Sequence, residues 1–472
     1  MSVIRPVPDE AFDLTCDIAV IGAGACGLTA GLRALEAGAD VIVLERDATP
    51  SGSTALSSGF VPAPGTRFQA ARGMADDPER FAEDIQYKAA GGADPDTVTT
   101  VTHAIGPALE WLADRHGLEW DVLDGFLYPG HRIHRMHAVP ERTGAALMGR
   151  LLTAAERSGL TLVTDAHVTA LFADANRRVA GLEITRPDGR TETLGFKALI
   201  LACNGYGGNP DLVAKHIPEM ANAPYYGHAG NQGDAVIWGE ALGAASRDLT
   251  AYQGHGSLAH PHNILITWAL MMEGGIQVNR DGRRFSNEHA GYSEQAQKVL
   301  QQPGGVAFAI YDEPLHQRGL GFPDYREAVA TGAVLSADSP EALERVCGLP
   351  AGSLQATLAE LRALRDADPD RRTDTFGRDF SGWKPFVSPL HAVRVTGAVF
   401  HTQGGLAVDD KARVKTRDGG ILPNLYAAGG AACGVSGARV EGYLSGNGLL
   451  TAIGLGFVAG KAAADATQSD QA

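Results

Sequence analysis

The chain has 472 residues, 59 of them glycine, and a formal net charge of -15 at pH 7. This length allows two or three domains with a large core. The acidic balance argues against nucleic acid as the main partner, because phosphate binding needs a basic surface. The five cysteines form no CxxC pair, which argues against zinc and iron–sulfur sites and favours a reduced, cytoplasmic protein.

The sequence contains no segment that we expect to enter a membrane. The N-terminal residues have no apolar signal core. No run approaches the roughly 18 apolar residues that a spanning helix needs. We therefore predict a protein without a membrane partner.

Residues 17–46 carry the strongest pattern in the chain. An apolar run at residues 18–21 leads into a glycine-rich turn and then into a helical pattern. A second apolar run at residues 41–44 ends on Glu45. This order of strand, glycine turn, helix, strand and acid is typical of a dinucleotide-binding unit. The alternative is a glycine-rich turn in some other α/β protein.

Each part of this unit has a physical role. Gly22 allows the tight turn, Gly24 lets a pyrophosphate approach the backbone, and Gly27 lets helix and strand pack closely. The helix N-terminus presents N–H groups and a partial positive charge to the phosphates. Glu45 can accept hydrogen bonds from a ribose hydroxyl.

The following segments continue an α/β pattern. Residues 50–64 are a small-residue loop that could let a flat ring lie against backbone, or a plain surface linker. Residues 76–118 and 145–157 are predicted to be helical, and residues 161–184 alternate as strands do. Residues 198–202 form a buried strand that ends in another small-residue turn.

Two further segments leave alternatives open. His131, His134 and His137 lie close together and could bind a metal, but the interleaved arginines would repel a cation. A solvated loop, or a loop near an anion, is the other interpretation. Residues 250–395 contain many histidines and few regular apolar runs. They are predicted to be a cap inserted into an α/β, Rossmann-like domain formed by residues 1–249 and 396–472.

The motifs occur in an order that resembles one family over nearly the whole chain. They are GSTALSSG, LILACNGYGG, GGIQVNRDGRRFSNE, HTQGGLAVDDKARV, NLYAAGG and SGNGLL. With the opening unit, they resemble the flavoproteins of the fumarate reductase and succinate dehydrogenase superfamily. The arrangement is most similar to soluble fumarate reductases and 3-ketosteroid 1-dehydrogenases. The resemblance implies a glutathione-reductase type FAD-binding domain with an inserted α+β capping domain.

The resemblance implies which residues contact FAD. They are Gly22, Gly24, Gly27, Glu45, Ser53, Thr54, Ser57, Gly59, Val168, Ala202, Gly205, Gly429, Asn447 and Leu449. The chain departs from the family at Cys203-Asn204, usually Thr-Gly, and at Gly430, often an acid. The GSTALSSG loop lacks the histidine that attaches flavin covalently in membrane-bound relatives, so we expect non-covalent FAD.

The catalytic positions resemble those of two activities. Fumarate reductases hold a dicarboxylate with two histidines and two arginines, and His255 and His401 match the histidines. Tyr292 and Tyr443 stand where the arginines are expected. Arginine forms bidentate pairs with carboxylates that tyrosine cannot replace. Tyrosines at these places instead resemble the 3-ketosteroid 1-dehydrogenases, where one takes part in proton abstraction and another binds the ketone oxygen.

These matches predict a dehydrogenase, or desaturase, that forms a C=C bond next to a ketone of a cyclic substrate, such as a steroid or an oxocycloalkane carboxylate. Tyr443 and a backbone N–H near Asn447 would stabilise the enolate. Tyr292 would take the α-proton, assisted by His255 or His289, and flavin N5 would take the β-hydride.

The sequence leaves other interpretations of the function open. The chain could be an enoate or enone reductase, or a flavin-binding protein without turnover, and the four catalytic candidates could be structural. The electron acceptor could be O2, a quinone or an electron-transfer protein. Arg439 could hold a substrate carboxylate or pair with Glu441, and Trp268 could line a pocket or fill the cap core.

Overall fold

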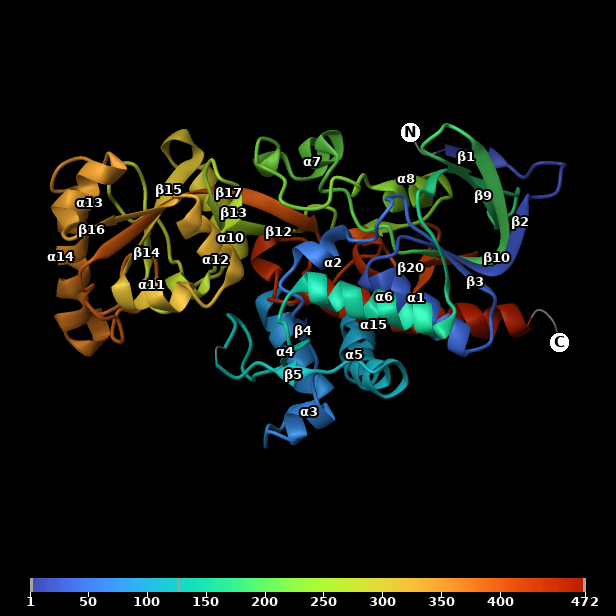
Figure 1. Ribbon diagram of the computed structural model, residues 1–472, viewed down its shortest axis with the longest axis horizontal. Helices are drawn as coiled ribbons and strands as arrows, with labels where there is room; N and C mark the ends of the chain where they lie inside the picture. Colours follow the sequence, from blue (N-terminus) through green and yellow to red (C-terminus); the bar gives the residue numbers. More distant parts are fainter. Residues whose placement is uncertain (1–2, 126, 470–472) are drawn as a thin grey trace. The chain divides into compact units, whose positions relative to one another are not determined.

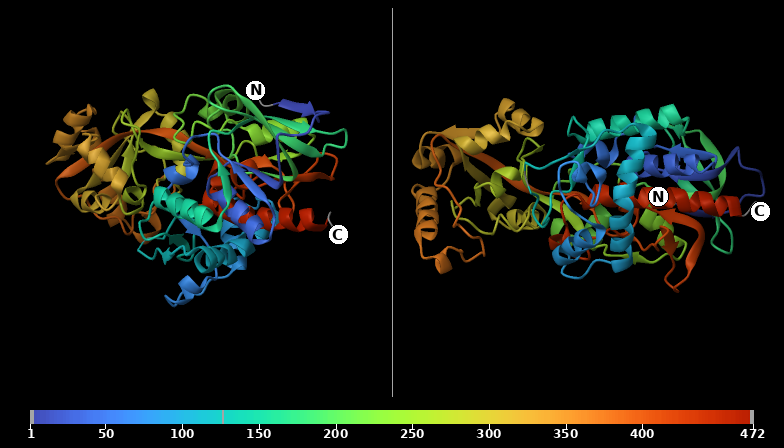
Figure 2. Two further views of the ribbon diagram at one scale, coloured as in Figure 1. Left: turned by 45° about the vertical axis from the view of Figure 1, so that its right-hand side comes forward. Right: turned by 90° about the horizontal axis from the view of Figure 1, so that it is seen from below.

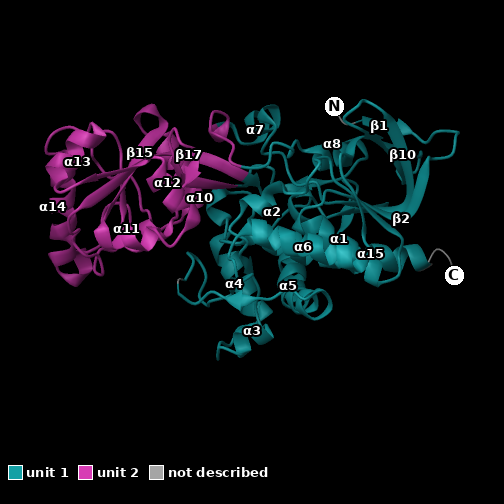
Figure 3. Cartoon of the chain, in the orientation of Figure 1, with its two compact units in different colours: residues 1–218, 227–252, 401–472 teal, residues 219–226, 253–400 magenta. Residues whose placement is uncertain are grey.

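The computed structural model describes residues 3–125 and 127–469. The chain divides into two compact units, shown in different colours in Figure 3. Unit 1 contains Met1–Pro218, Gly227–Tyr252 and His401–Ala472, and unit 2 contains Glu219–Tyr226 and Gln253–Phe400. Unit 2 is therefore inserted into unit 1 as two separate stretches of sequence.

Unit 1 contains most of the secondary structure. Its strands are β1 (Val3–Pro6), β2 (Leu14–Ile21), β3 (Val41–Leu44), β4 (Val61–Pro62), β5 (Asp121–Val122), β6 (Met136–Ala138), β7 (Thr161–Val163), β8 (His167–Ala173), β9 (Val179–Thr185), β10 (Thr191–Leu201), β11 (Ser246–Arg247), β18 (Gly405–Leu406), β19 (Arg413–Lys415) and β20 (Ile421–Ala427). Its helices are α1 (Ala25–Glu36), α2 (Gly52–Leu56), α3 (Arg67–Ala70), α4 (Pro78–Lys88), α5 (Pro95–His116), α6 (Gly144–Ser158), α7 (Pro210–His216), α8 (Asp234–Ala241) and α15 (Asn447–Ser469). Short 3-10 turns, η4 (Gly429–Ala431) and η5 (Val440–Gly442), precede α15.

The main sheet of unit 1 has the order β1-β8-β9-β10-β2-β3-β7, and β20 also pairs with β10. Strands β7, β3, β2, β10 and β20 are parallel, as the βαβ pattern of residues 17–46 predicts. The four apolar residues at positions 18–21 are all buried, with 0–6% exposure. Parallel strands are covered on both faces, which accounts for this continuous apolar run. The predicted α/β class is confirmed.

Helix α15 packs against α1 and α5 and carries much of the core of unit 1. Figure 1 shows α15 close to α1 below the sheet, and the views of Figure 2 also place these two helices side by side. By length and composition α15 could cross a membrane, although 56% of its apolar window is buried inside the protein. A core helix passes the same test, so this feature carries no argument for a membrane.

One predicted helix is two helices in the structure. Helix α4 ends at Lys88 and α5 begins at Pro95, so the helical pattern of residues 76–118 is interrupted. Ala90 has a φ of 50°, and two glycines follow it. A left-handed residue cannot continue a right-handed helix. The sequence itself marks this break with Gly91-Gly92 and Pro95, signals that the prediction of one helical segment did not use.

Unit 2 is built on a second sheet with the order β13-β12-β17-β15-β14, to which β16 adds by pairing with β17. Its strands are β12 (Tyr252–Ala259), β13 (Ile264–Leu265), β14 (Ile276–Val278), β15 (Val306–Asp312), β16 (Val334–Ala337) and β17 (Leu390–Thr402). Its helices are α9 (Ala269–Met272), α10 (Tyr292–Leu300), α11 (Glu313–Gly319), α12 (Pro323–Ala330), α13 (Pro340–Cys347) and α14 (Ser353–Asp366). The 3-10 turns η1 (Pro218–Met220), η2 (Pro303–Gly305) and η3 (Pro369–Arg371) complete the chain.

Candidate active site

The first glycine turn joins β2 to α1 in unit 1. Gly22 has a φ of 103°, and a Cβ placed on it would lie 2.6 Å from the carbonyl oxygen of Ala202. A Cβ on Gly27 would lie 1.8 Å from the carbonyl oxygen of Gly22. Both positions therefore require glycine. The N-cap residue Gly24 makes no side-chain cap, so the positive end of the α1 dipole is left for an anion.

Glu45 follows β3 and is fixed by two backbone groups. The N–H of Ala23 donates to its Oε2 at 3.0 Å, and the N–H of Asp47 donates to its Oε1 at 3.1 Å. These bonds tie the carboxylate to the first glycine turn. A carboxylate has about four lone-pair sites. Glu45 therefore retains capacity to accept further hydrogen bonds, and its contact with ribose hydroxyls stays a prediction.

The loop of residues 50–64 is bound to the start of α1 and contains the short helix α2. The Oγ1 of Thr54 accepts a hydrogen bond from the N–H of Ala25 at 3.0 Å. The hydroxyl of Ser57 donates to the carbonyl oxygen of Thr54 at 2.7 Å and accepts from the N–H of Gly59 at 3.0 Å. The loop is therefore an ordered part of the glycine-turn region, and the interpretation as a plain linker is wrong.

Ser53 connects this loop to two asparagines. Its Oγ accepts hydrogen bonds from the Nδ2 atoms of Asn204 and Asn231, both at 3.0 Å. The Oδ1 of Asn204 accepts from the N–H of Gly205 at 2.8 Å. A Cβ placed on Gly430 would lie 2.1 Å from the same Oδ1. Asn204 thus fills the space that a side chain at position 430 would need.

The other residues predicted to contact FAD also lie in unit 1. The N–H of Ala202 bonds to the carbonyl oxygen of Ile21 at 2.9 Å, which joins the second turn to β2. Gly429 has a φ of 59° in the turn before α15. Val168 is buried in β8, and Leu449 is half-buried in α15.

Asn447, the first residue of α15, has a fully buried side chain with one unused acceptor. Its Nδ2 donates to the Oγ of Ser436 at 3.0 Å. Within the described residues its Oδ1 has no hydrogen-bond partner. A buried acceptor without a partner is costly, by about 1–3 kcal/mol. The bare glycine turn, the fixed Glu45 and this acceptor together fit a bound dinucleotide with an N–H or O–H group directed at Asn447.

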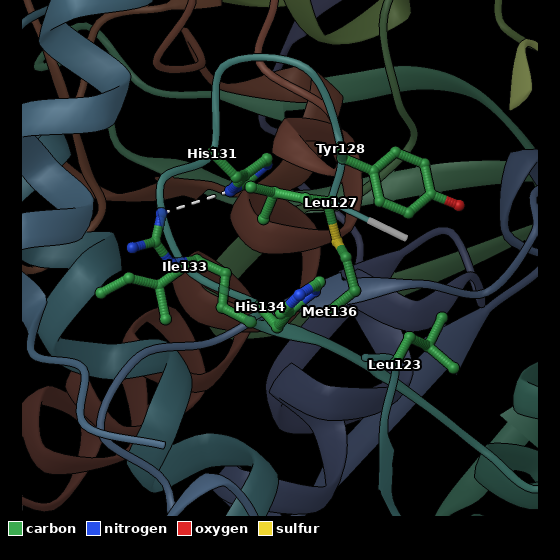
Figure 4. Close-up of a pocket in the computed structure, with 8 residues that line it drawn as sticks. Leu123, Leu127, Tyr128, His131, Ile133, His134 and Met136 are labelled. Carbon is green, nitrogen blue, oxygen red and sulfur yellow. Dashed lines mark hydrogen bonds between the residues drawn. The ribbon is translucent and has the colours of Figure 1, made fainter. Parts of the chain in front are cut away.

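The turn before Asn447 rests on the segment of residues 130–137. Arg135 donates to the Nδ1 of His131 at 3.2 Å, so the Nε2 of His131 is the donor to the carbonyl oxygen of Ser445 at 2.9 Å. Figure 4 shows His131 with the dashed line that joins its ring to a guanidinium nitrogen. Burial and the neighbouring Arg135 lower the pKa of His131 to about 4, so this ring is neutral.

Arg135 is fully buried and pairs with two carboxylates, at 2.5 Å to Asp84 and 2.9 Å to Asp76. Of the two interpretations of this histidine segment, the loop near an anion describes the structure, with the two aspartates as the anions. His131, Arg135 and His137 are buried in this segment, whereas Arg132 is exposed. Within residues 3–125 and 127–469, no group of three His, Cys, Asp or Glu side chains could hold a metal ion.

Two of the four predicted catalytic residues meet in unit 2. The ring of His255, on β12, stacks on the ring of Tyr292, at the start of α10, with centroids 4.9 Å apart. The ring of Phe400 stacks on His255 at 5.3 Å, and Trp268 meets it edge-on at 5.8 Å. The histidine therefore lies among aromatic rings, in a surrounding of low polarity.

His255 is a neutral hydrogen-bond donor. The N–H of Ser257 donates to its Nδ1 at 3.2 Å, so Nδ1 carries no proton and Nε2 carries one. Burial lowers the pKa of His255 to about 3. At neutral pH this side chain can therefore donate from Nε2, and its one basic nitrogen is already occupied.

A buried ion cluster supports the segment that ends at Tyr292. The carboxylate of Glu288 pairs with Arg284 at 2.6 Å and with Arg378 at 2.8 Å, and it accepts from the N–H of Gln277 at 2.9 Å. Burial alone would raise the pKa of Glu288, but Arg378 and Arg284 hold it down to about 2. This cluster fixes the residues just before α10 in unit 2.

The other two predicted catalytic residues meet in unit 1. The rings of His401 and Tyr443 contact edge to face, with centroids 5.7 Å apart. Tyr443 is 6% exposed, at the end of η5. The Nδ1 of His401 lies 3.0 Å from the Nε2 of Gln403. Burial lowers the pKa of His401 to about 4, so it too is neutral at pH 7.

The structure also places the residues for which the sequence left alternatives. Arg439 pairs with Glu441 at 3.3 Å on the surface. Trp268 is buried in the core of unit 2, and its Nε1 donates to the carbonyl oxygen of Glu288 at 3.2 Å. His289 bonds through Nε2 to the carbonyl oxygen of Met271 at 3.1 Å. His289 therefore has a structural partner in unit 2.

Several polar residues around the predicted site were not recognised from the sequence. Gln403, Ser436 and Asn231 hydrogen-bond to predicted site residues. Only Gln403 carried a usable signal, because it lies two residues after His401 and its side chain can reach that ring. Ser436 and Asn231 are distant in sequence from their partners, so no spacing rule identifies them.

The parallel sheet, the bare glycine turn and the fixed acid define a dinucleotide-binding fold. A family model described as FAD binding domain matches residues 17–449. The chain belongs to this family, and it is an FAD-dependent oxidoreductase that acts on CH–CH bonds.

Similar proteins of known name include both reductases and dehydrogenases. The probable fumarate reductase Ifc3 of Shewanella frigidimarina is 28% identical over 95% of this chain and 75% of its own length. The 4-oxocyclohexanecarboxylate 2-dehydrogenase of Sinomonas cyclohexanicum is 26% identical over 96% of both chains. The crystal structure of 3-ketosteroid-delta4-(5alpha)-dehydrogenase from Rhodococcus jostii RHA1 has a TM-score of 0.77 and 27% identity, and it covers 98% of this chain and 99% of its own.

Proposed function

We propose that the chain is an FAD-dependent dehydrogenase that introduces a C=C bond α,β to a ketone of a cyclic substrate. The observation that carries this proposal is that each candidate histidine contacts a tyrosine, at the two positions where the resemblance to fumarate reductases implies arginines. His255 and His401 have pKa values of about 3 and about 4, and each contacts a tyrosine ring. Neutral donors suit a ketone oxygen, whereas a dicarboxylate requires fixed cations.

Tyr443, Tyr292 and His255 each have a different role in the proposed reaction. Bound FAD supplies the hydride acceptor. The hydroxyl of Tyr443 donates to the ketone oxygen and stabilises the negative charge that develops when the α-proton leaves. Tyr292 takes that proton. A free tyrosine has a pKa of about 10, so its phenolate must be favoured by the protein. His255 orients the ring of Tyr292 by stacking and offers Nε2–H as a donor.

Tyr292→Phe tests this assignment directly. Because phenylalanine retains the stacked ring and lacks the hydroxyl, FAD should stay bound while turnover of a ketone substrate falls by about 100-fold or more. Tyr87→Phe is the matched control, because Tyr87 is 86% exposed on α4 and should show unchanged turnover. Near-normal turnover of the Tyr292 variant would remove this residue from the role of base.

A reductase that works in the opposite direction is the second candidate. The 28% identity to a probable fumarate reductase favours it. The two directions differ in how the flavin becomes reduced. Bleaching of the flavin by a saturated cyclic ketone, without added reductant, supports the dehydrogenase. Bleaching by dithionite alone, followed by reoxidation with an enone, supports the reductase. Repeating this assay with different cyclic ketones identifies the class of substrate. Repeating it with O2, a quinone or an electron-transfer protein as the oxidant identifies the electron acceptor.

A further inference from the structure

His401 has two ring nitrogens in different surroundings within unit 1. A Cβ placed on Gly448 would lie 3.0 Å from both Cε1 and Nε2 of the ring. This edge therefore faces the turn at the start of α15. The other ring nitrogen, Nδ1, lies 3.0 Å from the Nε2 of Gln403 and 3.3 Å from the carbonyl oxygen of Thr402. Which nitrogen carries the proton decides what His401 can do.

A chain of three side-chain hydrogen bonds ends at Nδ1. The Nδ2 of Asn447 donates to the Oγ of Ser436 at 3.0 Å, and the Ser436 hydroxyl donates to the Oε1 of Gln403 at 2.7 Å. The Nε2 of Gln403 then faces the ring of His401 at 3.0 Å. Asn447, Ser436 and Gln403 are 0%, 1% and 5% exposed, so water does not compete with these bonds.

The direction of this chain determines the tautomer. An amide nitrogen only donates and an amide oxygen only accepts. Because the oxygen of Gln403 takes the proton of Ser436, its nitrogen is the group that meets His401, and Nδ1 must accept. The proton of the neutral imidazole is then on Nε2. The contact of Nδ1 with the carbonyl oxygen of Thr402 is longer, and it would need the opposite tautomer.

We propose that Asn447, Ser436 and Gln403 are a relay of positioning residues that holds His401 as the Nε2–H tautomer, so that His401 donates a hydrogen bond to the substrate carbonyl oxygen and cannot act as a base. The role toward the substrate rests on the proposed function. The relay itself rests only on side chains of unit 1.

Two observations agree with this assignment. Burial keeps His401 uncharged at neutral pH, so its function depends on the tautomer and not on a positive charge. The Oδ1 of Asn447 has no partner among the described residues, which leaves it as an acceptor for bound FAD. The outer end of the relay is thus a residue predicted to contact the cofactor. Binding of FAD would then fix the orientation of the amide from which the relay begins.

The relay also narrows the chemistry of the substrate. A neutral N–H donor stabilises an oxygen that gains negative charge, as a ketone oxygen does when the α-proton leaves. It supplies no full charge for an ionised carboxylate. The rings of His401 and Tyr443 contact edge to face, so the two side chains lie together in unit 1. In this tautomer the Nδ1 of His401 accepts from Gln403 and is not free to act as a base.

The tautomer can be measured directly in the FAD-loaded enzyme. Two-bond 1H–15N correlation spectra of a sample labelled at histidine distinguish a protonated from an unprotonated ring nitrogen, and His401→Gln assigns the signal. We expect Nε2 of His401 to be protonated and Nδ1 to be unprotonated throughout neutral pH. A protonated Nδ1 would overturn the relay, because Gln403 would then present its oxygen.

Substitutions in the relay provide a second test. Gln403→Glu replaces the donor by a carboxylate that only accepts, so the proton should move to Nδ1 and the pKa of His401 should rise. Turnover should fall by about 100-fold, the effect expected for one lost oxyanion donor. Gln301→Glu makes the same chemical change at an exposed position and should alter neither the His401 signal nor the rate. An unchanged His401 signal in Gln403→Glu would contradict the relay.

Two variants of Ser436 distinguish a specific effect on the His401 tautomer from a general loss of structure. Ser436→Thr keeps the hydroxyl and should keep the Nε2–H signal, whereas Ser436→Ala frees the amide of Gln403 and should give a mixture of tautomers. Equal spectra for these two variants would contradict the relay. If the wild-type enzyme shows the Nε2–H signal but oxidises no cyclic ketone, the relay stands and the proposed function fails. The spectra therefore separate the two failures.

Discussion

Asn204 and Gly430 form a complementary pair at the residue scale. Asn204 has a φ of 64°, and its side chain bonds to Ser53 and to the N–H of Gly205. Asparagine tolerates this left-handed conformation better than most residues. Its Oδ1 occupies the position where a side chain on Gly430 would begin. The side chain at position 204 therefore fits only beside a residue without a side chain at position 430.

We expect Gly430→Ala to destabilise unit 1 by about 1–3 kcal/mol, because the new methyl group would overlap the amide of Asn204. Adding Asn204→Gly should restore most of this loss, since glycine accepts the same backbone conformation and removes the clash. Asn204→Gly alone should lose about 1 kcal/mol through the bond to Ser53. Thermal unfolding and the Kd of FAD from flavin fluorescence measure these effects. A double variant no better than Gly430→Ala would contradict the pairing.

At the scale of the elements, the ion pairs of the buried Glu288 hold the segment that leads into α10. Glu288 is fully buried with a pKa of about 2, while an unfolded glutamate titrates at about 4.3. A folded pKa below the unfolded one means that the unfolded state binds more protons at acid pH. This contribution is complete above about pH 4.3 and is lost as the pH falls toward 2. It amounts to about 3 kcal/mol.

We therefore expect unfolding by urea to become easier between about pH 4.3 and 2, with Glu288 as one cause. Trp268 donates to the backbone of Glu288, so its fluorescence should report on this segment. Glu288→Gln should destabilise the protein by about 3–5 kcal/mol at neutral pH, because it leaves the buried Arg378 without its carboxylate partner and Arg284 with Asp374 alone. The stability of the variant against urea should also depend less on pH in the acid range. An unchanged acid dependence would show that other carboxylates dominate.

The elements differ in how far their sequence predicts them. Strands β2 and β3 and helix α1 follow from local apolar runs and glycines, and the structure has them where expected. The break at residues 89–94 was missed although Gly91-Gly92, the N-cap Asp94 and Pro95 mark it in the sequence. The cofactor turns are predictable because each is a contiguous motif. Ser436, which hydrogen-bonds to Gln403, and the aspartates that pair with Arg135 are not, because hydrogen bonds between distant segments leave no periodic signal in the sequence.

At the scale of the whole molecule, the residues predicted to bind the cofactor and the strands of the second sheet belong to different units. Every residue predicted to contact FAD lies in unit 1, whereas His255 and Tyr292 lie in unit 2. The sheet of unit 2 has its own buried strand β15, whose seven residues are all buried. Binding of a ligand to the native state stabilises whatever unfolds together with its site. The response to FAD therefore tests whether the two units unfold separately.

We expect hydrogen exchange to show this separation when the apo and FAD-loaded proteins are compared by mass spectrometry. At an FAD concentration about 100-fold above the Kd, the stabilisation is about 2.7 kcal/mol, which slows exchange through unfolding by about 100-fold. Peptides that contain the first glycine turn and the start of α15 should gain this protection. Peptides of β15 should change little, because that strand belongs to the core of unit 2. Equal protection of β15 would show that the two sheets unfold as one cooperative structure, and FAD would then stabilise the whole chain.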